Sequence, residues 1–177
     1  MIKKRCWLAL LVIFVITGIG CGASDLSEMQ GKEEIAQAIE GMHDAITKVD
    51  LWETQEGMYR ASIFVDEGTS VSSSSLIFML SQDMVEIARE AMSSGGDEVL
   101  EEFLFFARTG EGDLLFKGWY KTDRFAGADL DNTPSQEFLN LARKLEVRPR
   151  GKRAIARYCR DEDNARMSRS FCVKALR

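Results

Sequence analysis

Residues 99–122, VLEEFLFFARTGEGDLLFKGWYKT, carry the strongest structural pattern in the chain. The first part, residues 99–108, is a mostly apolar run that is typical of a strand covered by other elements. The connection at 109–113 contains two glycines, which can adopt the positive φ of a tight turn. In residues 114–122 polar and apolar side chains alternate, as in a strand with one buried face. This stretch therefore predicts an antiparallel β-hairpin.

The chain before the hairpin predicts two helices and a strand. Apolar residues recur at helical spacing over residues 28–49, so we expect one amphipathic helix there. Residues 58–65 alternate between apolar and polar side chains and predict a strand. Helical spacing returns over 76–91 and ends at the Ser-Ser-Gly-Gly sequence of 93–96. A short strand at 76–80, followed by a shorter helix, is the alternative for this region.

The chain after the hairpin is helical in pattern. The sequence from Thr133 to Gln136 has the spacing of a capping box, with proline at the first helical position, so we expect a helix over 133–145. Pro149 and Gly151 then break that helix, and the remaining residues predict two short helical pieces. Together these elements predict an α+β fold in two layers, a small and mainly antiparallel sheet with helices packed on one face.

The first residues have the composition of a secretory signal. Three basic residues at positions 3–5 precede an apolar run, and the next charged residue is Asp25. A basic start, a short apolar core and an exit of small residues are typical of a signal peptide. The uncharged residues 6–23 barely reach the length of a membrane span, so a retained anchor is the alternative. We expect residues 1–20 to be a signal peptide that is removed.

Ile19-Gly20-Cys21, at the end of the apolar core, resembles the lipobox of bacterial lipoproteins. In that class the cysteine receives a diacylglycerol, the preceding peptide is removed and the new amino end is acylated. The resemblance implies fatty acyl chains, such as palmitate, on Cys21, and several such chains make membrane anchoring stable. Gly22 stands where the class uses aspartate for retention at the inner membrane, so the resemblance favours the outer membrane if the cell has one. The alternative is ordinary cleavage after Gly20 or Ala23, which would leave a soluble periplasmic protein.

The four cysteines suit an exported protein. Cys6 would leave with the signal peptide, and Cys21 would carry the lipid. Cys159 and Cys172 remain as an even pair, which predicts a disulfide in an oxidising compartment. They are too far apart for a C-x-x-C redox motif, and a chain with one histidine is a poor candidate for a Cys/His zinc site. We expect a helical C-terminal segment stapled by a disulfide, no metal and no cofactor.

Charge divides the exported part of the chain into two. Residues 22–147 contain 25 acidic and 10 basic residues, whereas residues 148–177 contain 3 acidic and 10 basic residues. We therefore expect a lipid anchor and short tether at 21–27 and an acidic α+β domain at 28–147. Residues 148–177 should form a basic C-terminal segment that packs on the same domain.

This basic segment has two interpretations. It could bind an anionic partner, namely the lipid headgroups of a membrane, an acidic polymer of the envelope or an acidic protein face. Arg153, Arg157 and Arg160 are the candidate partner-binding residues. The segment could instead lie on the acidic domain and relieve the repulsion among its acids. Nucleic acid is not an expected partner. A basic footprint alone is a weak signal, and the compartment to which the chain would be exported holds little nucleic acid.

The sequence contains no recognisable catalytic constellation. His43 is the only histidine, and no G-x-S-x-G elbow accompanies it, so we expect it at the surface or at its boundary. Glu101 and Glu102 are neighbours on a predicted strand and should point to opposite faces, which keeps them out of one cleft. Residues 129–132 resemble the start of a calcium loop, but proline stands at the glycine position and asparagine at the final glutamate position. We predict no catalytic residue and no metal ligand.

These features favour a non-catalytic function in the bacterial cell envelope. The leading hypothesis is a lipid-anchored protein that faces the periplasm and binds another envelope component, in an assembly, exclusion or scaffolding role. The second hypothesis is a periplasmic carrier of a small ligand, with a pocket lined by the aromatic residues Trp52, Phe105, Trp119 and Tyr120. The third hypothesis is an enzyme, which would need carboxylates that the fold brings together.

Overall fold

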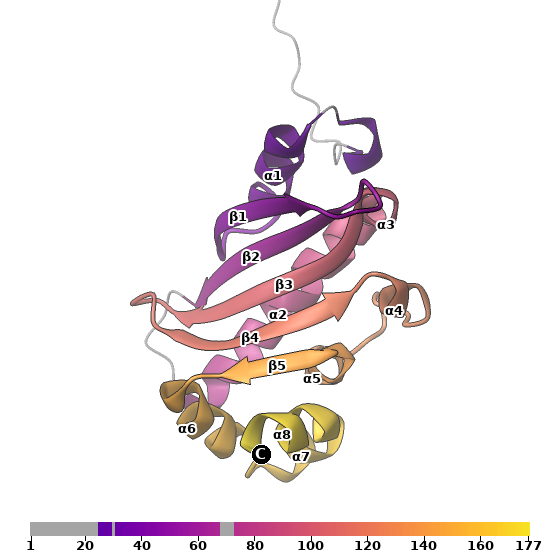
Figure 1. Ribbon diagram of the computed structural model, residues 1–177. Helices are drawn as coiled ribbons and strands as arrows, with labels where there is room; N and C mark the ends of the chain where they lie inside the picture. The colour runs from indigo at the N-terminus through magenta and orange to yellow at the C-terminus, as the bar shows by residue number, and fades with distance from the viewer. Residues whose placement is uncertain (1–24, 30, 68–72) are drawn as a thin grey trace, which may run out of the picture.

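The computed structural model describes residues 25–29, 31–67 and 73–177 (Figure 1). The predicted signal peptide and Cys21 lie outside these residues. No helix within the described ranges is long and apolar enough to cross a membrane. The chain forms a five-stranded sheet whose strands follow one another in sequence order. The strands are β1 (Ile46–Glu53), β2 (Tyr59–Glu67), β3 (Leu100–Thr109), β4 (Leu114–Lys121) and β5 (Lys144–Val147).

Neighbouring strands are antiparallel, except that β2 and β3 run parallel. A parallel connection has to return along a face of the sheet, and helix α2 (Ser73–Ser93) makes this return behind the strands in Figure 1. α2 packs against β2, β3 and the C-terminal helix α6 (Pro149–Tyr158). The fold is therefore α+β, with a mainly antiparallel sheet and helices on one face, as the sequence predicts.

The remaining helices are short. α1 (Lys32–Glu40) packs against β1, and α8 (Arg169–Leu176) packs against β5, so the two ends of the described chain lie at opposite edges of the sheet (Figure 1). The others, in chain order, are the 3-10 helix η1 (Leu26–Glu28), α3 (Gly96–Val99), α4 (Asp123–Ala126), α5 (Ser135–Phe138), the 3-10 helix η2 (Leu139–Leu141) and α7 (Glu162–Met167).

The predicted hairpin is confirmed in β3 and β4, which pair antiparallel. Phe103 and Phe105 of β3 are fully buried, and so are Phe116 and Tyr120 of β4. Gly112 adopts a φ of 82° in the connecting turn, a conformation that glycine reaches without a steric penalty. The alternation in β4 thus records which face of the sheet is covered.

α2 supplies the other half of the core. Its helical stripe is confirmed, because Leu80, Met84, Ile87 and Ala91 are all fully buried. Residues 76–80 are helical, so the alternative of a short strand there is wrong. The helix ends at the Ser-Ser-Gly-Gly sequence, as predicted.

The helix predicted over 28–49 is wrong in its second half. α1 ends at residue 40, and β1 begins at Ile46. A β-bulge between Ile46 and Lys48 interrupts the alternation of the strand, so that Ile46 and Val49 oppose the buried residues Val65 and Ile63 of β2. Two apolar residues three positions apart on a strand therefore imitate a helical stripe.

The helix predicted over 133–145 is also wrong in its extent. Only α5 and η2 are helical, and Leu145 lies in β5. The hydroxyl of Thr133 donates to the carbonyl of Asp129 at 2.7 Å and makes no cap. Pro149, predicted to break a helix, is the first residue of α6, where a missing N–H has no cost.

Gly151 was also predicted to break a helix, but it lies buried inside α6. A Cβ atom at this position would collide with the backbone carbonyl of Leu115 in β4. The lack of a side chain therefore lets α6 approach the sheet closely.

We expect Gly151→Ala to lower the free energy of unfolding by about 2–3 kcal/mol, because backbone in a strand cannot move aside as a flexible side chain can. Urea denaturation measures the change. Gly127→Ala is the matched control, since a Cβ there meets no heavy atom closer than 4.0 Å, and it should change stability by about 0.5 kcal/mol or less. Equal stabilities of the two variants would contradict the close packing.

Candidate functional site

The basic segment, residues 148–177, folds into α6, α7 and α8 rather than the two helical pieces expected. The predicted disulfide is confirmed between Cys159 and Cys172, which joins the end of α6 to α8. Closing a loop of this size stabilises a fold by about 3 kcal/mol in the chain-entropy model. The buried hydroxyl of Tyr158 is 2.7 Å from that of Ser168, which donates to the Gln136 carbonyl at 2.9 Å. The segment is thus held together internally and tied to the domain.

Further polar contacts fix the segment to η2 and to the residue that follows it. The amide of Asn140 donates to the Met167 carbonyl at 2.5 Å, and its oxygen accepts the N–H of Phe171 at 3.0 Å. The Lys174 ammonium donates to the Ala142 carbonyl at 2.6 Å. The segment therefore packs on the acidic domain as one body with it.

α6 has a buried side and a charged side. Gly151, Ala154, Ile155 and Tyr158 are buried and face the core. The three candidate residues, Arg153, Arg157 and Arg160, are exposed, and their spacing of four and three residues places them along one side of the helix and its end. Arg150 forms an ion pair with Asp113 in the β3–β4 turn. The segment thus makes a charge contact with the domain, and the three candidates are exposed.

The basic segment lies far from the N-terminal end of the described chain. The N–H of Leu26 donates to the Ser94 carbonyl at 2.7 Å, so η1 sits just beyond the last residue of α2. α6 lies near the other end of α2, beside β4 and β5 (Figure 1). The 21 residues of α2 span about 31 Å, which is the scale of the separation.

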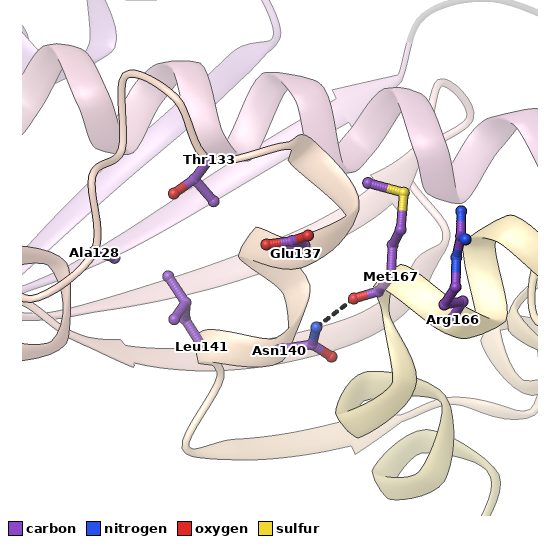
Figure 2. Close-up of a pocket in the computed structure, with 7 residues that line it drawn as sticks. All are labelled: Ala128, Thr133, Glu137, Asn140, Leu141, Arg166 and Met167. Atoms are coloured by element: carbon purple, nitrogen blue, oxygen red, sulfur yellow. Dashed lines mark hydrogen bonds between the residues drawn. The ribbon is translucent and has the colours of Figure 1, made fainter.

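A surface hollow of about 680 Å³ lies between the α5–η2 turn and α7 (Figure 2). Asn140 on its wall uses both polar atoms of its side chain in hydrogen bonds to Met167 and Phe171. Arg166 forms an ion pair with Asp163 at 2.8 Å. Its lining residues are Ala128, Thr133, Glu137, Asn140, Leu141, Arg166 and Met167.

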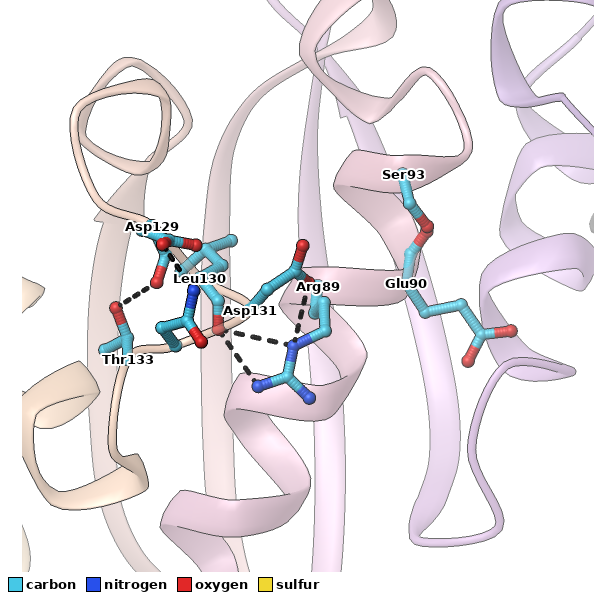
Figure 3. A network of polar contacts seen from close by, with 8 residues as sticks. Arg89, Glu90, Ser93, Asp129, Leu130, Asp131 and Thr133 are labelled. Atoms are coloured by element: carbon cyan, nitrogen blue, oxygen red, sulfur yellow. Dashed lines mark hydrogen bonds and ion pairs between the residues drawn. The ribbon is translucent and has the colours of Figure 1, made fainter.

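The loop that resembles a calcium loop is held by α2 (Figure 3). The Arg89 guanidinium donates from Nη2 to the Leu130 carbonyl at 3.0 Å and lies 3.4 Å from the carboxylate of Asp131. The side-chain amide of Asn132 donates to the Asp129 carboxylate at 2.6 Å. These acids thus shape the loop that leads into α5.

The four aromatic residues proposed to line a carrier pocket lie on two sides of the sheet. Phe105 and Tyr120 are fully buried in the core, where their rings meet edge to face at 5.6 Å. Trp52 is 64 % exposed on β1, and the indole of Trp119 lies under the Lys144 ammonium at 4.5 Å. No single pocket is shared by the four, and a carrier function stays a prediction.

The sheet face opposite α2 covers its own aromatic residues. The rings of Phe64 and Phe106 stack at 4.3 Å. Lys48 and Arg108 lie 5.5 and 5.3 Å from the centre of the Phe64 ring, and Lys117 lies 4.8 Å from that of Phe106. Cations over ring faces are attracted by the ring quadrupole, and their aliphatic stems shield apolar surface from water. This face is therefore stable in water without a covering layer.

Sequence reasoning missed a cluster of titratable groups. His43 Nε2 lies 3.3 Å from the Glu86 carboxylate and 3.9 Å from that of Asp83 on α2. Burial raises the pKa of Asp83 to about 6; Glu67 and Glu86 also raise it, and His43 opposes the shift. The Asp83–Glu86 spacing of three residues was a visible signal, but Glu67 comes from β2 and His43 from the turn after α1. The described residues hold no group of three or more potential ligands arranged for a metal ion.

Comparison of the chain with family models, curated proteins and solved structures found no match.

We expect Asp83→Asn to stabilise the protein above pH 6. The pKa of Asp83 is raised from 3.8 in the unfolded chain to about 6 in the folded one, so its ionisation opposes folding as the pH rises through this window. The gain should be about 1 kcal/mol at pH 7.5, allowing for solvent screening, and should vanish below pH 3.8. Urea denaturation across this pH range measures it.

Glu90→Gln is the control, because it removes one charge of α2 outside the cluster. A gain from Asp83→Asn that is the same at both ends of the pH range would show that ionisation of Asp83 is not its cause.

Proposed function

We propose that this chain is a lipid-anchored, non-catalytic protein of the bacterial cell envelope that binds another envelope component through its basic segment. The observation that carries the proposal is the outward side of α6 and its end, where three arginines are exposed and the other side of the helix is fixed in the core. Arginine presents a rigid fork of donors that suits carboxylate and phosphate groups. Its role would be assembly, exclusion or scaffolding.

Location in the envelope rests on two features. The first is the signal-like N-terminus ending at Cys21, with the lipobox resemblance. The second is the Cys159–Cys172 disulfide, since such bonds persist in oxidising compartments such as the periplasm. The domain would face the periplasm, from the outer membrane if the cell has one.

A small-ligand carrier is the alternative proposal. It would depend on the hollow beside α7, whose volume of about 680 Å³ falls within the range of ligand sites. Thr133, Glu137 and Arg166 on its wall would then contact a polar ligand, so that the pocket would have a polar lining in place of the aromatic lining that the sequence suggests.

Cys21→Ser tests the anchor. The mature protein should begin at Cys21 and carry fatty acyl mass, whereas the variant should carry no acyl mass. Intact-mass spectrometry of both proteins measures the difference. Cys6→Ser is the matched control, because Cys6 lies in the peptide that processing removes, and its mature mass should be unchanged. A mature chain that starts upstream of Cys21, or has no acyl mass, would rule out the anchor.

The double variant Arg153→Glu, Arg160→Glu and the triple variant that adds Arg157→Glu test the binding surface. Partner recovery after chemical cross-linking in intact cells should fall at least about tenfold, because repulsion replaces attraction at an exposed site. Thermal melting should show that the double variant stays folded.

A triple variant with Lys32, Gln37 and Gln55 changed to Glu is the control, since it lowers the net charge by four, as the arginine double variant does, at exposed sites elsewhere. It should recover the partner normally. Unchanged recovery by the arginine variants would remove α6 as the binding surface.

A further inference from the structure

Two aliphatic side chains of α8 are exposed within the basic segment. Of the large hydrophobic residues in the described ranges, only Val173, Leu176 and Trp52 are exposed, and the first two are each 45 % exposed. The other apolar residues of α8, among them Phe171, are buried against α6 and the domain. Val173 and Leu176 are three residues apart, so they are neighbours on the outer side of the helix.

Two arginines lie close to this apolar pair. Arg169 precedes Val173 by four residues, one helical turn away on the same side of α8. The disulfide brings the Cα atoms of Cys159 and Cys172 to 6.0 Å, and Arg160 and Val173 are the residues that directly follow them. The disulfide therefore holds Arg160, at the end of the arginine side of α6, near the apolar pair.

We propose that Val173 and Leu176, with the arginines around them, form a docking surface for an acidic protein. An apolar centre within a charged rim is the usual anatomy of a protein–protein interface, where arginine is enriched. An acidic polysaccharide would engage the arginines but would leave two aliphatic side chains without a partner. A membrane-binding helix needs a continuous apolar face. α8 exposes only two large aliphatic side chains over its 8 residues, which is too few for such a face.

The docking surface deepens the proposed function and rests on it, and its position is remote from the proposed lipid anchor. η1, where the described chain begins, and α6 lie near opposite ends of α2, about 31 Å apart by the rise of its 21 residues. Electrostatic attraction in physiological salt decays over about 8 Å. The docking surface is therefore remote from the point where the anchor would join the described chain, and headgroups at that point would not attract its arginines.

A photo-cross-linking side chain, p-benzoylphenylalanine, placed at position 173 of the full chain in its host tests the proposal. One protease-sensitive adduct should form, and the cross-linked peptide of the partner should be rich in Asp and Glu. Val173→Asp with Leu176→Asp should lower recovery of the same partner, after chemical cross-linking of the chain without the probe, at least about tenfold. Trp52→Asp is the matched control, because Trp52 is the exposed apolar residue at the opposite edge of the sheet, and it should leave recovery unchanged.

A lipid adduct, a protease-resistant polysaccharide adduct, an adduct with a second copy of this chain, or no discrete adduct would each overturn the proposal. On vesicles of phosphatidylcholine and phosphatidylglycerol in equal amounts, the purified lipidated protein should give no lipid adduct from position 173. The two proposals fail separately. Acyl mass on Cys21 and loss of the partner in the arginine variants, without an adduct at 173, would refute only the docking surface. An acidic-protein adduct from a chain without acyl mass would refute only the anchor.

Discussion

β2 and β3 pair in parallel although they are consecutive strands, so the chain between them must return along one face of the sheet. α2 is that return segment, and its buried stripe meets the apolar residues of β2 and β3 to form the core. The consequence is a layer of helices on one face and an open face on the other. α2 also sets the long dimension of the molecule, with η1 beyond its last residue and α6 near its other end (Figure 1).

The open face is the side of the sheet opposite α2, and cations shield its aromatic residues from water. Lysine and arginine side chains lie over the rings of Phe64, Phe106 and Trp119 and replace a second helical layer. Glu102, 1 % exposed on β3, lies 2.8 Å from Arg60 and 3.2 Å from Arg143. The Arg60 contact is an ion pair without an aligned hydrogen bond, so attraction rather than directional bonding compensates for much of the burial of this carboxylate.

The basic segment differs from the open face, where cations cover the aromatic rings. Its inner side is fixed by the disulfide, by Gly151 against Leu115 and by Asn140 between η2 and the last two helices. Its outer side combines exposed arginines with two exposed aliphatic residues. Groups held rigidly before binding lose little conformational freedom on association, which favours a role in recognition.

The sequence by itself determined the elements whose pattern is local. The β3–β4 hairpin and α2 follow from alternation and helical spacing, and the disulfide follows from counting cysteines in a chain that its N-terminus predicts to be exported. Only the tertiary structure shows that β1 is a strand. A bulge between Ile46 and Lys48 places two apolar residues three positions apart on one face of this strand, a spacing that is also typical of a helix. Tertiary structure also explains why position 151 is glycine, because a carbonyl of another element leaves no room for a side chain there. It also forms the cluster of His43 and Asp83, whose members come from three separate segments. Periodicity describes one segment at a time, whereas contacts between segments depend on how their backbones pack.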